Sequence, residues 1–105
     1  MEDRPAPKVK TTNTVHHNGQ TYTRTGRRYS HAVITVTSAT ETHTGNPYPV
    51  LVQWASSLEL AQRNADQIAG RRDRACNGTL RGGWGKEWHA GITDIDVIPV
   101  EHEES

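Results

Sequence analysis

The chain has 105 residues, and its 12 Lys and Arg residues balance 12 Asp and Glu residues, so its formal net charge is zero. A chain of this length forms one domain with a small core, and only 32% of its residues are hydrophobic. Zero net charge excludes a global attraction to nucleic acid or acidic lipid, so any such attraction must come from local clusters of charge.

Both ends of the chain are polar. Residues 1–8 carry charge and two prolines, and residues 101–105 are acidic. This composition predicts a flexible N-terminal tail, a single folded domain over residues 9–100 and an acidic C-terminal tail. No apolar run approaches the roughly 20 residues of a membrane span, and the N-terminal segment lacks the apolar region of a signal peptide. The lone Cys76 excludes an intramolecular disulfide, so we expect a cytoplasmic protein without a membrane partner.

The first part of the chain is predicted to form a β-hairpin. Thr-rich segments lie on both sides of Asn18-Gly19 over residues 9–25. This dipeptide best supplies the two positive φ angles of a type I′ turn, so the hairpin is the strongest local prediction.

Two further strands are predicted before the helix. In residues 29–37, Ala32, Ile34 and Val36 alternate with His31, Val33 and Thr35, and β-branched residues dominate. This pattern predicts a half-buried strand, which could be a central strand of the sheet. Residues 38–49 contain turn formers and two prolines and predict a loop. Residues 50–54 predict a short strand that ends at Trp54, which we expect to pack under the start of the helix.

One helix is predicted to follow. Its apolar stripe recurs at spacings of three and four residues and consists of Leu58, Ala61, Ala65 and Ile68. Ser56 with Glu59 matches a capping box at its start. The helix can end at Gly70 or continue to Asn77-Gly78. We favour the longer helix, because an interior glycine costs only about 1 kcal/mol.

The last third of the chain is predicted to be a connector and a strand. Residues 79–91 contain four glycines and two tryptophans, which predicts a long flexible connection or a ribbon that turns back on itself. Residues 92–100 predict a final strand, and Pro99 indicates an edge strand or its end. The predicted fold is α+β: a small antiparallel or mixed sheet of about four to five strands with one helix on one face, in β-β-β-β-α-β order.

The glycine-rich connector provides the leading functional hypothesis. Aromatic side chains on such a segment are typical anchors for a partner protein, and Trp84 and Trp88 lie there with Arg81 and Lys86. We therefore interpret the chain as a non-enzymatic interaction module that binds another macromolecule, with no cofactor and no metal. An exposed edge strand could also pair two copies into a homodimer.

Nucleic-acid binding is the second hypothesis. Arginines can hold phosphates bidentately, and the connector tryptophans can stack on unpaired bases. The arginines concerned are Arg27, Arg28, Arg71, Arg72, Arg74 and Arg81. This hypothesis predicts that they share one face, although Asp73 interrupts the run and the domain is not basic.

A small hydrolase or nuclease is the third hypothesis. It would use His31 or His89, together with Arg28 or a metal held by Asp94 and Asp96. The six histidines have no spacing typical of metal ligands, and no common nucleophile or phosphate-binding motif is present. We therefore assign no catalytic residues.

Three segments in order carry a family resemblance: GQTYTRTGRRYSHAVITV, VQWASSLELAQRNADQI and DIDVIPVE. The chain resembles small uncharacterised proteins of actinobacterial phages over residues 19–101, with an apparent insertion between Arg71 and Gly91. The resemblance implies a phage accessory protein in the host cytoplasm, with a host macromolecule, most simply a host protein, as the partner of the interaction module, and it brings no catalytic residues.

Overall fold

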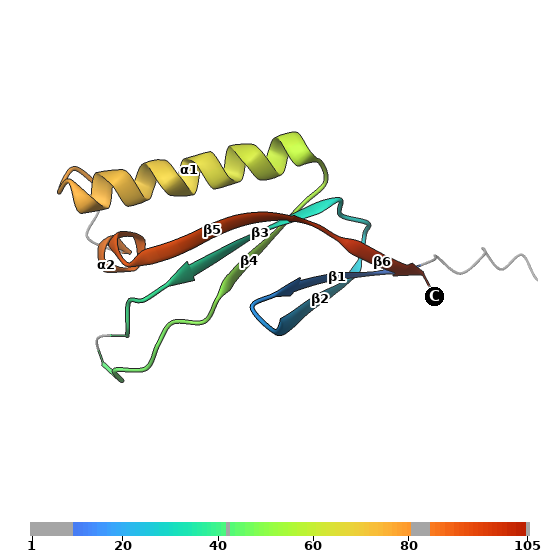
Figure 1. Ribbon diagram of the computed structural model, residues 1–105, viewed down its shortest axis with the longest axis horizontal. Coiled ribbons are helices and arrows are strands. Elements are labelled where there is room, and N and C mark those ends of the chain that lie inside the picture. The colour runs from blue at the N-terminus through green and yellow to red at the C-terminus, as the bar shows by residue number, and fades with distance from the viewer. Residues whose placement is uncertain (1–9, 42, 81–84, 105) are drawn as a thin grey trace, which may run out of the picture.

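The computed structural model describes residues 10–41, 43–80 and 85–104. Within these residues the fold is α+β, with six strands in two small antiparallel sheets and one main helix packed against strands (Figure 1). The order of the larger elements is the predicted β-β-β-β-α-β. None of the described helices is long and apolar enough to cross a membrane.

The first sheet is built around the predicted hairpin. Strands β1 (Thr11–His17) and β2 (Gln20–Gly26) pair through a turn in which φ is 49° at Asn18 and 78° at Gly19. These positive angles are those that a type I′ turn requires. The hairpin prediction is therefore confirmed.

The third strand of this sheet comes from the C-terminal end of the described chain. Strand β6 (Glu101–Glu104) pairs with β1, so that the strand order is β2-β1-β6. The expectation of a solvated tail from residue 101 is wrong for these residues. The hairpin leaves one edge of β1 unpaired, and backbone pairing with that edge orders a segment whose own composition is typical of a tail.

The second sheet contains the buried centre of the fold. Strand β3 (His31–Thr37) lies between β4 (Leu51–Ala55) and β5 (Ile92–Pro99), all antiparallel. Four consecutive residues of β3 are buried, because elements cover both faces of the sheet. The prediction of a central strand over residues 29–37 and of an edge strand from residue 92 is confirmed.

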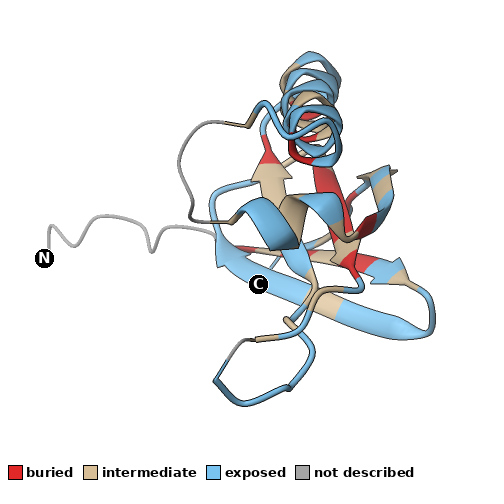
Figure 2. Cartoon of the chain, turned by 90° about the vertical axis from the view of Figure 1, so that its left-hand side faces the viewer, coloured by how far each residue is buried: buried red, intermediate tan, exposed pale blue. Residues whose placement is uncertain are grey.

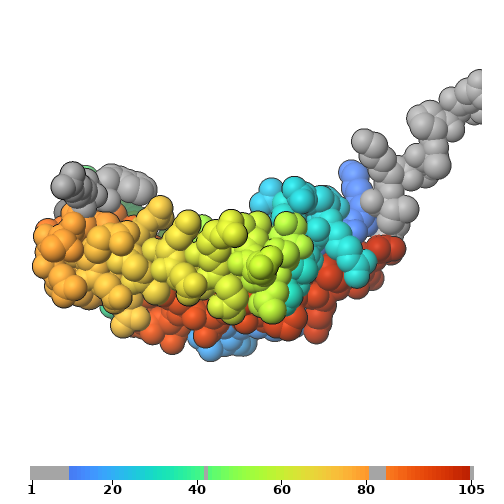
Figure 3. Space-filling model, turned by 90° about the horizontal axis from the view of Figure 1, so that it is seen from above, coloured from blue at the N-terminus to red at the C-terminus, as the bar shows by residue number. Residues whose placement is uncertain are grey.

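Helix α1 (Leu58–Cys76) continues through Gly70, as the longer alternative predicted. Its N-cap differs from the prediction: Ser57 Oγ, not that of Ser56, accepts a hydrogen bond from the Leu60 amide at 3.1 Å. Glu59 is therefore the second helical residue, one position short of the one that completes a capping box. Helix α1 covers the larger part of one face of the molecule (Figure 3).

The molecule has three layers, with α1 and the hairpin on opposite faces of the second sheet (Figures 1 and 2). On the helix side the buried cluster consists of Val33, Ala55, Ala61, Ile68 and Ile92. On the hairpin side it consists of Val15, Ala32, Ile34 and Val100. Trp54 packs against the hairpin cluster and not under the helix, because neighbouring residues of a strand point to opposite faces and Ala55 takes the helix side.

The connector before β5 also departs from the prediction of an irregular segment. Residues Lys86–Ala90 form a short helix, α2, beside the C-terminal end of α1 (Figure 1). The Thr37 hydroxyl donates a hydrogen bond of 2.8 Å to the carbonyl of Trp88 and ties α2 to β3. Trp84 and Arg81 lie outside the described residues.

Candidate functional site

A hollow of about 920 Å³ lies between α2 and the loop that joins β3 to β4. Both segments lie at the end of the molecule that faces the viewer in Figure 2. The apolar and aromatic part of the lining comes from Tyr48, Pro49, Val50, Leu51 and Trp88. The charged part comes from Glu41, Arg71, Lys86 and Glu87, and His43 and His89 complete the wall with the backbone of Gly85.

Helix α2 is held in place by contacts at both of its ends. Gly85 begins it with a φ of 80°, a conformation that residues with a Cβ rarely adopt, and its carbonyl accepts a 2.6 Å hydrogen bond from His89 Nδ1. The Trp88 and His89 rings meet edge to face, with centroids 4.9 Å apart. The Trp88 side chain is half-buried and packs against the helix-side core. One wall of the hollow is thus an aromatic side chain anchored by its neighbours.

The opposite wall is a loop that closes on itself. The Glu41 amide donates to the Asn46 carbonyl and the Gly45 amide donates to the Glu41 carbonyl, both at 2.8 Å. The Thr44 hydroxyl donates to the Glu41 carboxylate at 2.9 Å. These bonds define the turn that carries the chain to Tyr48 and Leu51 at the hollow.

Two of the four residues predicted to contact a partner belong to the described part of the chain. Lys86 and Trp88 line the hollow together. Sequence reasoning missed the contribution of the β3–β4 loop. In the sequence, the Tyr48-Pro49 dipeptide between turn formers is the one sign that this loop is rigid and aromatic. Its position opposite α2 depends on the tertiary fold.

The predicted arginine surface is divided between two ends of the molecule. Arg71 lines the hollow near the C-terminal end of α1. Arg28 pairs with Glu104 at 3.1 Å and lies close to Ser30, whose amide donates to Ala55 just before α1 begins. At 1.5 Å per residue, Arg71 is about 20 Å further along the helix axis. The structure therefore does not bring Arg27 and Arg28 together with the arginines of α1.

A different pair of arginines does converge. The guanidinium carbons of Arg24 and Arg27 lie 5.5 and 5.3 Å from the centroid of the Tyr29 ring, within the range of cation–π contacts. The Trp54 ring lies 6.1 Å from Tyr29 at an interplanar angle of 41°. The run TRTGRRY holds these residues, but their convergence requires the chain to turn after β2, which spacing alone does not reveal.

The residues of the hydrolase hypothesis lie apart. Asp96 faces the hairpin, where its carboxylate accepts a 2.6 Å hydrogen bond from His17 Nε2. His31 and Val33 have the same strand parity, which places His31 on the helix side of the sheet. His89 belongs to α2. In the described ranges no group of three His, Cys, Asp or Glu side chains could hold a metal ion.

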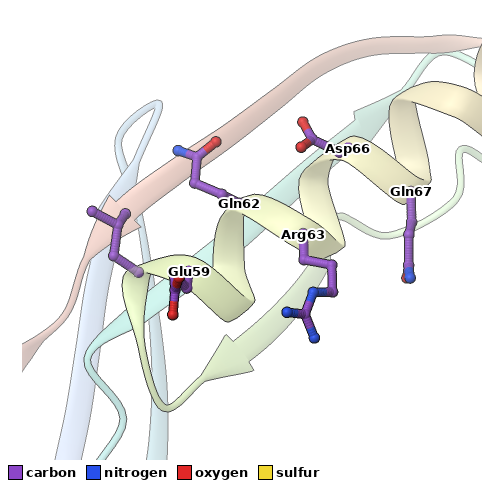
Figure 4. A pocket seen from close by; sticks show the side chains of 6 residues that line it. Glu59, Gln62, Arg63, Asp66 and Gln67 are labelled. Carbon is purple, nitrogen blue, oxygen red and sulfur yellow. The ribbon is translucent and has the colours of Figure 1, made fainter.

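The solvent face of α1 offers a shallower surface. It is lined by Leu58, Glu59, Gln62, Arg63, Asp66 and Gln67, five of which are labelled in Figure 4. Leu58 is 51% exposed. This face lacks an aromatic side chain, which distinguishes it from the hollow beside α2.

No protein-family model matches the chain, and neither a curated protein nor a solved structure matches it.

Proposed function

We propose that this protein is a non-enzymatic binding module that holds a segment of a partner protein in the hollow beside α2. The observation that carries the proposal is the composition of this hollow, where apolar and aromatic side chains from the β3–β4 loop meet Trp88. Its volume of about 920 Å³ lies within the range of small-ligand pockets and is sufficient for several side chains.

The aromatic residues suit the role of anchors. Tyr48 and Trp88 present large, rigid surfaces with one polar atom each, a combination that is enriched at binding interfaces. Trp88 is already ordered by its contact with His89, so a partner would not have to immobilise it. Such preorganisation lowers the entropic cost of association.

The charged lining supports selectivity. Arg71 and Lys86 contribute positive charge and Glu41 and Glu87 negative charge. Charges of both signs around an apolar centre favour one orientation of a bound peptide and oppose others. The resemblance to actinobacterial phage proteins supports a host protein as the partner and the host cytoplasm as the place of binding.

The test is quantitative recovery of bound host proteins by four forms of the immobilised chain: the wild type and three variants. Trp88→Ala and Lys86→Glu change the hollow, and Leu58→Ala is a matched control on the solvent face of α1. A specific partner should be recovered equally by wild type and the control, and at least about tenfold less by the hollow variants. Equal recovery of every protein by all forms would exclude the hollow as the binding site.

Nucleic-acid binding is a second candidate, favoured by the placement of Arg24 and Arg27 over Tyr29. Guanidinium groups ordered in this way could contact successive phosphates of a single strand. Titration of labelled single-stranded RNA and DNA at two salt concentrations tests it, because phosphate contacts must weaken steeply with salt. Arg24→Gln/Arg27→Gln should abolish binding, and Arg71→Gln/Arg72→Gln is the matched control.

A further inference from the structure

The two sheets have four edge strands, and three of them carry charge or proline. Strand β2 carries Arg24, β5 carries two aspartates and Pro99, and β6 carries three glutamates. Natural sheets use such residues to prevent an edge from pairing with another chain. Strand β4, with the sequence LVQWA, has neither charge nor proline.

The backbone groups that β4 presents at its outer edge follow from the register. The Val100 amide donates to the Ser30 carbonyl at 2.9 Å, and His31 lies opposite Pro99. Even-numbered residues of β3 therefore bond to β5, and odd-numbered residues bond to β4.

Because Val33 lies opposite Gln53, the odd-numbered residues of β4 bond to β3. The N–H and C=O groups of Val52 and Trp54 then point away from the sheet. These two residues present the hydrogen-bonding edge to which another strand could add.

We propose that two copies of this chain pair β4 with β4, antiparallel, about a two-fold axis at Gln53. Val52 then lies opposite Trp54 of the second copy, and their outward backbone groups form the hydrogen-bonded pairs of an antiparallel ladder. The two β4-β3-β5 sheets become one continuous sheet. The contact is isologous, because each copy uses the same strand.

A second copy fits this edge because the strand is complementary to itself. Antiparallel self-pairing of β6 or β5 would bring carboxylates close to carboxylates, whereas in β4 it brings together only uncharged side chains. Leu51, which is 38% exposed, would lie opposite Ala55 of the second copy and lose contact with water.

Gln53 supplies an independent observation. Its Oε1 atom is buried and has no hydrogen-bond partner among the described residues. An unsatisfied buried polar atom is unfavourable, because it has lost its hydrogen bonds to water without gaining others. At the two-fold axis, the side-chain amides of the two Gln53 residues lie opposite each other and can satisfy one another.

The proposal is tested by measuring the mass of the purified full chain by light scattering over a range of concentrations. The wild type should reach twice the 11.7 kDa of one chain. Gln53→Lys and Gln53→Glu should each be monomeric, because like charges would meet at the axis, and an equimolar mixture should recover the dimer. A wild type that stays monomeric overturns the proposal, as does a dimer that both single variants retain.

A cross-linking experiment tests the register and does not depend on the charged variants folding. In a Cys76→Ser background, Gln53→Cys should form a disulfide-linked dimer on mild oxidation, because the two residues occupy a non-hydrogen-bonded pair with Cα atoms about 4.5–5.5 Å apart. Leu51→Cys is the matched control, since its two copies would be about 14 Å apart along the strands. Cross-linking of Leu51→Cys but not of Gln53→Cys would overturn the proposed register.

Discussion

At the scale of single residues, Asn13 joins the hairpin to the rest of the molecule. Its side chain is fully buried, and its Nδ2 group donates to the carbonyls of Arg24 and Arg27 at 2.9 and 2.8 Å. Its Oδ1 atom accepts from the Tyr29 amide at 2.9 Å. One side chain thus bonds to three backbone groups: the Arg24 carbonyl of β2, and the Arg27 carbonyl and Tyr29 amide of the turn between β2 and β3.

Replacement of Asn13 with Ala should therefore lower the free energy of unfolding by about 2–4 kcal/mol, because it leaves several buried polar groups without partners. Thr14→Ala, on the other face of the same strand, should change it by less than about 1 kcal/mol. Urea denaturation of both variants measures the difference. Equal effects would show that the hydrogen bonds of Asn13 do not hold this junction.

At the scale of elements, α1 is determined by its cap and its apolar stripe. Ser57 has the extended backbone of an N-cap, with φ −151° and ψ 160°. The stripe presents Ala61 and Ile68 to the sheet and continues beyond Gly70 to the buried Ala75. Burial on both sides of Gly70 explains why the helix continues, since packing outweighs the cost of one interior glycine.

Ser57→Ala should destabilise the protein by about 1 kcal/mol, because the Leu60 amide loses its acceptor. Ser56→Ala should have an effect within about 0.5 kcal/mol, since Ser56 is exposed and precedes the cap. Thermal unfolding followed by far-UV circular dichroism compares the two. A larger loss for Ser56→Ala would mean that the helix begins one residue earlier.

At the scale of the whole molecule, the two sheets share one core. Val15 of the hairpin packs with Ala32 and Ile34 of β3. His17 at the hairpin tip donates to Asp96 of β5, and the chain passes from β5 in one sheet to β6 in the other. The hairpin is therefore a layer of the domain and not an appendage.

Val15→Ala should destabilise the entire domain by about 1–3 kcal/mol, because it opens a cavity in this shared core. Trp54 packs on the hairpin side, so in a Trp84→Phe/Trp88→Phe background the fluorescence of Trp54 reports on that layer, and far-UV circular dichroism reports mainly on α1. Both signals should change in one coincident denaturation transition. A Trp54 transition at lower denaturant than that of the helix would show that the hairpin unfolds separately.

The features that could be predicted from the sequence are those with local causes. The Asn18-Gly19 turn, the alternation in β3 and the three- and four-residue spacing of α1 each depend on residues close together in the chain. The hairpin, the central strand and the helix were predicted correctly for this reason. Trp88 and Lys86 could be identified as neighbours because they lie two residues apart.

Other features were decided by contacts between distant segments. The acidic residues 101–104 form a strand only because β1 offers an edge, and α2 is tied to β3 by the hydrogen bond from Thr37. The side of the sheet taken by Trp54, the separation of the arginine groups and the hollow beside α2 depend on how the three layers stack. Local composition carries no information about such stacking, because it arises from burial shared between segments that only folding brings together.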